Sequence, residues 1–201
     1  RGLGDVYKRQ LLDFGIAKVL DAETPATRLG LRPMTPRYAA PELLQGGAVT
    51  TAADVFALGV LLYEILAGVG PYPGGKLTEE ELRRAVCETP TAPPSRRVGE
   101  AGEGPSPRER ARRRATTPDG LRRRLQGDLD VIVATALRKD PEERYRSVDE
   151  LAADLRRHRH ELPVTARPPT LRYRARKFAR RHRLPVALSA AGALLLLTVA
   201  A

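Results

Sequence analysis

Four short motifs follow one another along this chain, and their order constrains its fold more than its composition does. Residues 13–15 read Asp-Phe-Gly, residues 40–42 read Ala-Pro-Glu, residues 54–59 read Asp-Val-Phe-Ala-Leu-Gly, and residues 140–145 read Asp-Pro-Glu-Glu-Arg-Tyr. Each motif alone is a weak signal. Their order and spacing together make the signal strong.

The motifs resemble those of the bacterial Hanks-type serine/threonine protein kinases. In that family the first two motifs bracket the activation segment. The third resembles the start of the buried central helix of the large lobe, and the fourth resembles the segment whose arginine pairs with the glutamate of Ala-Pro-Glu. The resemblance covers roughly residues 11–183. It predicts a mainly α-helical fold, that of a protein kinase C-terminal lobe.

The resemblance also implies roles for individual residues. Asp13 would hold the Mg²⁺ that bridges the phosphates of ATP, and Phe14 would pack to set the active or inactive state, followed by Gly15. Glu42 and Arg144 would form a buried ion pair. Asp54 would hold the catalytic-loop backbone, or would serve only as a helix cap.

Three threonines between the first two motifs are candidate activation-loop sites: Thr24, Thr27 and Thr35. A phosphate on Thr24 or Thr27 would add negative charge that nearby arginines can bind, which would order the loop. The alternative is that both are exposed and unmodified. Thr35 resembles the threonine that helps to hold the substrate hydroxyl, although Met34 stands where many relatives have glycine.

Only 12 residues precede Asp13, and they contain no glycine-rich loop, strand lysine, helix glutamate or catalytic loop. Because phosphoryl transfer needs these parts, the chain by itself is predicted to be inactive. We refer to the longer kinase of which it would be a piece as the parent protein. Residues 1–10 fit no kinase pattern and are interpreted as a non-native cloning or assembly scar. The alternative is a β-strand leading into Asp-Phe-Gly.

Hydrophobic periodicity predicts helices over 51–67, 79–87 and 128–138, and another that begins near Ser147. Capping boxes are predicted at Thr51–Asp54 and at Thr78–Glu81. The helix over 51–67 is apolar nearly all round, so burial on every side is expected. Residues 89–107 are rich in proline and glycine and are interpreted as a loop.

The net charge of +11 is unevenly distributed. Arginine runs at 112–114 and 122–124 have no interleaved aromatic residues, which favours a solvated or acid-binding face over a nucleic-acid site. His158, His160 and His182 lack partners at metal-binding spacing and are interpreted as surface histidines. The single cysteine, Cys87, excludes an internal disulfide and fits a reducing compartment.

Residues 171–183 carry seven Lys/Arg and no acid, and residues 184–201 carry no charge. This pattern predicts a basic juxtamembrane linker over 163–183 and a truncated transmembrane helix over 184–201, after a kinase lobe over 11–162. Tyr173 and Phe178 are placed at the headgroup level. The alternative for residues 184–201 is a buried tail helix.

The parent protein is therefore expected to be a single-pass kinase of the inner membrane, with its lobe in the cytoplasm. It would transfer the γ-phosphoryl group of ATP to serine or threonine of protein substrates, using ATP and Mg²⁺. The block Arg172–Arg183 would bind the anionic membrane surface. Nucleic acid is not expected as a partner, and dimerisation of the parent is left open. The alternative function is a membrane-anchored pseudokinase scaffold.

Overall fold

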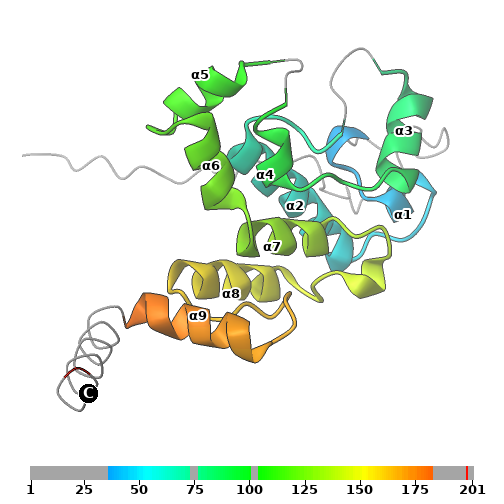
Figure 1. Cartoon of the computed structure of the whole chain (residues 1–201). Coiled ribbons are helices and arrows are strands. Elements are labelled where there is room, and N and C mark those ends of the chain that lie inside the picture. The colour runs from blue at the N-terminus through cyan, green and yellow to red at the C-terminus, as the bar shows by residue number, and fades with distance from the viewer. Residues whose placement is uncertain (1–35, 73–76, 101–103, 183–197, 199–201) are drawn as a thin grey trace, which may run out of the picture.

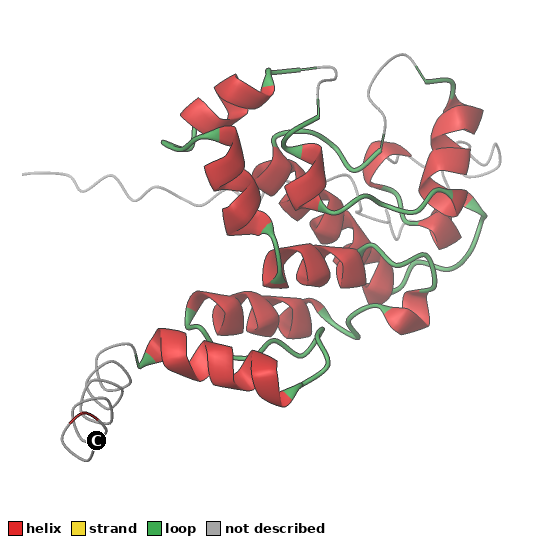
Figure 2. Cartoon of the chain, viewed as in Figure 1, coloured by secondary structure: helices red, strands yellow, loops and turns green. Residues whose placement is uncertain are grey.

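The computed structural model describes residues 36–72, 77–100, 104–182 and 198, and every element in these ranges is helical (Figures 1 and 2). This agrees with the predicted mainly α-helical fold. No strand occurs in the described residues. The elements are η2 (Pro36–Tyr38), α1 (Pro41–Leu44), α2 (Thr51–Ala67), α3 (Glu79–Glu88), α4 (Pro94–Arg97), α5 (Pro107–Arg112), α6 (Pro118–Leu125), α7 (Asp128–Ala136), η3 (Pro141–Glu143), α8 (Val148–Arg159) and α9 (Leu171–Arg181).

Helix α2 is the centre of the packing, because its apolar residues enter two different clusters. Phe56 and Val60 pack with residues from α3, α6 and α7. Val55 packs in the second cluster with Ile132 of α7 and Leu151 of α8. Burial from two sides explains why apolar residues occupy both of these faces of α2.

Burial of α2 is nevertheless incomplete in the described residues, so the prediction of burial on every side is wrong at one face. Leu58, Leu61 and Ile65 follow one another at helical spacing on the side opposite Phe56. The first two are half-buried, and Ile65 is 60% exposed. Clusters on two sides leave this third face only partly covered.

A close approach of helices sets the position of α7 against α2. Gly59 of α2 faces α7 so closely that a Cβ atom built on it would lie 2.9 Å from the Cβ of Ala136 and 3.1 Å from a methyl of Leu137. Real Cβ atoms do not approach this closely. Glycine therefore allows the two helices to meet over this part of the core.

The helix ends test the predicted caps. Thr78 accepts from the Glu81 amide and Glu81 accepts from the Thr78 amide, as the capping box requires, and Ser147 caps α8 as expected. The box at Thr51–Asp54 is wrong. The N-cap of α2 is Thr50, which places Asp54 one residue too far along the helix for the reciprocal bond.

The segment predicted as a loop contains a short helix, α4, and α5 and α6 were not predicted at all. Each of the three begins with proline in its first turn, where a missing amide costs nothing. Ser106 and Thr117 cap α5 and α6. The pattern of Ser or Thr followed by Pro was thus an available signal for two of these helices.

The segment predicted as a basic linker contains an eleven-residue helix, α9, at the lower edge of the molecule in Figure 1. Its Tyr173 is buried, so the expected place of Tyr173 among lipid headgroups is wrong. In the described residues no helix is long and apolar enough to cross a membrane. The predicted span over 184–201 lies outside these residues, apart from residue 198, and the expected domain boundaries stay predictions.

Candidate functional site

The structure describes the second part of the predicted site, from Pro36 onward. The candidate magnesium triplet and the candidate activation-loop threonines lie outside the described residues: Asp13, Phe14, Gly15, Thr24, Thr27 and Thr35. The site that can be built from contacts is therefore the anchor of the segment that directly follows Thr35. It consists of η2, α1 and the side chains that hold them to the rest of the lobe.

Glu42 lies in the first turn of α1. Both of its carboxylate oxygens accept hydrogen bonds from Arg144, which follows η3. The two Nη atoms of Arg144 each donate to one carboxylate oxygen of Glu42 at 2.7 Å. This is the bidentate geometry that fixes a guanidinium and a carboxylate in one plane. The ion pair expected between Glu42 and Arg144 is present, across 102 residues of sequence.

Arg144 uses all five of its N–H donors. Besides Glu42 it donates to the carbonyl oxygens of Arg138, Lys139 and Ala52 at 2.7, 3.0 and 2.9 Å. Its side chain is fully buried, and its guanidinium lies 4.9 Å from the centre of the Phe56 ring. One arginine thus joins α1, the start of α2 and the turn before η3.

A second contact holds η2 to the C-terminal half of α2. The Tyr38 hydroxyl donates to Glu64 at 2.9 Å, and Arg37 forms an ion pair with the same carboxylate at 3.0 Å. Burial and the Glu64 hydrogen bond raise the pKa of Tyr38, so the hydroxyl keeps its proton at neutral pH. Arg37 and Tyr38 are therefore both held to one residue of the central helix, Glu64.

Asp54 lies in the first turn of α2 and is half-buried. Within the part of the chain that the structure describes, it has no hydrogen-bond partner. Its carboxylate stands near the helix N-terminus, where negative charge is stabilising. The expected contact between Asp54 and a catalytic loop stays a prediction.

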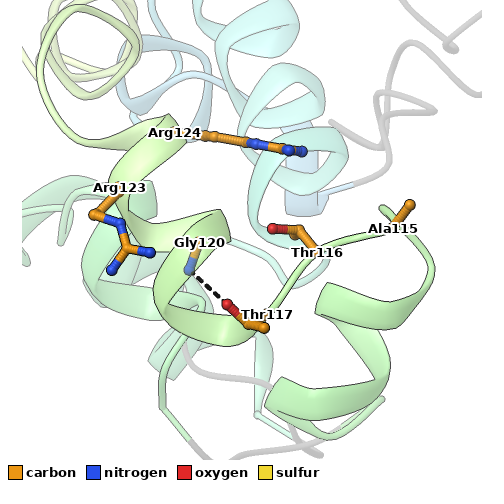
Figure 3. Close-up of a pocket in the computed structure, with 6 residues that line it drawn as sticks. All are labelled: Ala115, Thr116, Thr117, Gly120, Arg123 and Arg124. Carbon is orange, nitrogen blue, oxygen red and sulfur yellow. Dashed lines mark hydrogen bonds between the residues drawn. The ribbon is translucent and has the colours of Figure 1, made fainter.

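A surface hollow lies elsewhere, between the turn after α5 and helix α6. Ala115, Thr116, Thr117, Gly120, Arg123 and Arg124 line it (Figure 3). Thr117 already uses its hydroxyl oxygen to accept from the Gly120 amide at 3.1 Å, as the N-cap of α6. None of the predicted site residues lies there. The described residues also contain no group of acids, histidines or cysteines able to hold a metal ion.

A buried charged cluster, absent from the sequence predictions, joins α9 to the lobe. The Lys177 ammonium lies 2.7 Å from Asp128 and 2.9 Å from Glu161, and both Lys177 and Asp128 are almost fully buried. His158 and Arg167 each approach Asp128 at 3.6 Å. The side chain of His158 is still 32% exposed, so the prediction of a surface histidine holds only in part for this residue.

Tyr173 docks beside this cluster. The Val164 amide donates to the Tyr173 hydroxyl at 3.1 Å, and the Arg167 guanidinium lies 4.7 Å from the centre of the Tyr173 ring. The loop that receives Tyr173 is itself held in place, because the amides of Thr165 and Ala166 donate to buried Asp154 at 2.7 and 2.8 Å. The loop between α8 and α9 is thus bonded to both helices.

Replacing Asp128 with asparagine should loosen α9. Burial alone would raise the pKa of Asp128, but His158 and Lys177 lower it below its usual range, so the carboxylate is charged at neutral pH. Asp128→Asn weakens the contact with Lys177, which retains its ion pair with Glu161. The free energy that holds α9 to the lobe should fall by about 1.5–3 kcal/mol. Faster amide hydrogen exchange confined to α9 at pH 7 would support this; unchanged exchange would contradict it.

The same cluster gives α9 docking a defined pH dependence. Because the pKa of Asp128 is lower in the docked state than in the unfolded chain, its charged form stabilises docking. This contribution is complete above the pH at which an unfolded aspartate ionises, about 4, and it is lost as the pH falls further. The pKa of Lys177 is raised: burial opposes this, and the hydrogen bonds to Asp128 and Glu161 outweigh burial. The lysine contribution is therefore lost only at alkaline pH, above about 10.4.

Comparisons with known proteins identify relatives. A family model described as "Protein kinase domain" matches residues 5–158. Serine/threonine-protein kinase PknB of Mycobacterium tuberculosis H37Rv is 32% identical over 156 residues, which are 77% of this chain and 21% of PknB. Serine/threonine-protein kinase Pkn1 of Myxococcus xanthus is 32% identical over 139 residues, 69% of this chain and 16% of Pkn1.

The chain thus spans about a fifth of the length of the curated relatives that it matches. The family match includes the Asp-Phe-Gly and Ala-Pro-Glu motifs and extends into the last turn of α8. It begins at residue 5, inside the segment interpreted as a scar, whose origin stays a prediction. Helix α9 lies beyond the matched range.

Proposed function

The chain belongs to the protein kinase domain family, and we propose that its parent protein transfers the γ-phosphoryl group of ATP to serine and threonine hydroxyls of protein substrates. The observation that carries this proposal is the anchored end of the activation segment. Glu42 and Arg144 fix α1 to the base of the lobe, and Tyr38 and Glu64 fix η2. Thr35, the proposed substrate shelf, directly precedes η2 in the sequence.

Phosphoryl transfer depends almost entirely on positioning and electrostatics, which is what such anchoring supports. Asp13 would supply an anionic oxygen ligand for the Mg²⁺ that accompanies ATP, and that ion offsets charge on the phosphates. Thr24 and Thr27 are proposed phosphorylation sites that order the segment. The 201 residues alone are proposed to be inactive, because their sequence lacks the glycine-rich loop and the catalytic base.

The parent protein is also proposed to be anchored in the inner membrane by residues 184–201, with its lobe on the cytoplasmic side. The 18 uncharged residues of this segment follow the seven Lys/Arg of residues 171–183. Basic residues beside a spanning helix mark its cytoplasmic end. The anionic leaflet would attract this block.

The activity is tested on the parent protein with Mg-ATP labelled at the γ-phosphate and a generic protein substrate. The expected result is label on phosphoserine and phosphothreonine and none on phosphotyrosine after acid hydrolysis of the substrate. Label on phosphotyrosine would contradict the proposed acceptor class. ATP turnover without labelled protein would contradict protein phosphorylation, and no turnover at all would favour a pseudokinase scaffold.

A further inference from the structure

Helix α9 uses one side to dock on the lobe. Tyr173 and Lys177 are one turn apart, and both are about 4% exposed. The ammonium of Lys177 is therefore paired with Asp128 and Glu161, although in the sequence Lys177 belongs to the basic block. The orientation of the whole helix is fixed by these two residues.

The opposite side of α9 carries an apolar ridge. Leu171, Ala175 and Phe178 follow at spacings of four and three residues, which place them on one stripe of a helix, turned away from Tyr173. Leu171 is 83% exposed and Phe178 is 54% exposed. Among the described residues, the ring and cation contacts of Phe178 are with His182 and Arg181, at its own end of the helix.

Arginines border this ridge on both sides. At 100° per residue, Arg174 and Arg181 fall on one flank and Arg172 and Arg176 on the other, and all four are exposed. An apolar stripe between two rows of cations is the pattern of a helix lying in a membrane interface. In the sequence, the uncharged and mostly apolar residues 184–201 begin three positions after α9 ends at Arg181.

We propose that the outward face of α9 inserts Leu171 and Phe178 shallowly into a membrane of anionic lipid, while the arginines on both flanks bind the headgroups. The proposal rests on the membrane anchor proposed for residues 184–201 and deepens it. An acidic protein would match the arginines but not a ridge of leucine and phenylalanine, whereas an anionic bilayer matches both.

Docking on the lobe and insertion into the membrane use different residues of α9. Because Tyr173 and Lys177 hold α9 to the lobe, the bilayer that receives Phe178 also fixes the orientation of the lobe. The segment that the sequence predicts as a linker would then act as a rigid arm. The lobe would present one defined face to the membrane surface.

A tryptophan at position 178 tests the insertion directly, because the chain contains no other tryptophan. Phe178→Trp in the full 201-residue chain is incorporated into lipid nanodiscs made with phosphatidylglycerol, with and without brominated acyl chains. The F178W emission is expected to shift to shorter wavelength and to be quenched by the bromines. Val49→Trp is the matched control: Val49 is a comparably exposed apolar residue, outside α9. Its emission should stay unquenched.

The role of the arginines is tested in the same discs. Combining F178W with Arg174→Glu and Arg176→Glu, one on each flank, should abolish the quenching while the hydrogen-exchange protection of α9 remains. Discs of phosphatidylcholine alone should also quench less. Equal quenching in both lipids, or in the charge-reversed variant, would contradict the assignment to anionic lipid.

Three further outcomes would overturn the proposal in distinguishable ways. If the chain is incorporated but the indole of F178W stays in water, the insertion of α9 is contradicted and the proposed membrane anchor is not. A chain that fails to incorporate removes the anchor and the insertion together. A shifted emission in lipid-free solution that depends on protein concentration would mean that a second copy covers the ridge.

Discussion

Replacing Arg144 with alanine in the parent protein is expected to lower the free energy of unfolding of the large lobe by about 3–5 kcal/mol. The loss is large because Arg144 is fully buried and Glu42 would remain with no cation opposite it. Three backbone carbonyls would lose their donor as well. Glu42→Ala should cost a similar amount, since it leaves the buried guanidinium without its carboxylate.

Urea unfolding of the two single variants and the double variant measures the pair. The double variant should lose clearly less than the sum of the singles, because the second substitution removes a charge that the first has already left unpaired. Arg138→Ala is the matched control. Its ion pair with Glu143 is exposed on both sides, so the expected change is only about 0–1 kcal/mol. Additive costs at Glu42 and Arg144 would contradict a coupled pair.

The parts of the fold that the sequence predicts are those with a local signal. Helix α2 is apolar nearly all round, α7 and α8 carry apolar residues at helical spacing, and Thr78 and Ser147 have the side chains that cap a helix. The pair of Glu42 and Arg144 was predictable in another way, from the resemblance to a family. Nothing local connects two residues that lie 102 positions apart.

The docking of α9 had no such signal. Lys177 is one of seven basic residues in a short block, and the sequence does not distinguish it from those that face solvent. Its partner Asp128 stands at the start of α7, where an acid is expected simply as a favourable helix-terminal charge. Only the three-dimensional packing brings these two charges together and excludes water from them.

The composition of residues 171–183 does not by itself separate a linker from an amphipathic helix. The deciding features are the positions of Tyr173 and Lys177 on one side and of Leu171 and Phe178 on the other. The periodicity was present in the sequence. The high density of arginine concealed it, because a flexible basic segment and a docked basic helix have the same composition.

Asp13→Asn in the parent protein is expected to abolish phosphoryl transfer. The substitution keeps the size of the side chain but removes the anionic oxygen that would hold Mg²⁺ beside the ATP phosphates. Asp13 should contribute little to folding, so the variant should unfold at the same urea concentration as the wild type. Loss of activity with intact stability would separate a catalytic role for Asp13 from a structural one.

The measurement that tests the kinase assignment most directly is the transfer of γ-phosphate by the wild-type parent protein and by its Asp13→Asn variant, purified side by side. Transfer to serine and threonine by the wild type, and none above blank by the variant, is the predicted result. Equal transfer by both proteins would contradict the account, because the group that defines the proposed magnesium site would then have no part in the reaction.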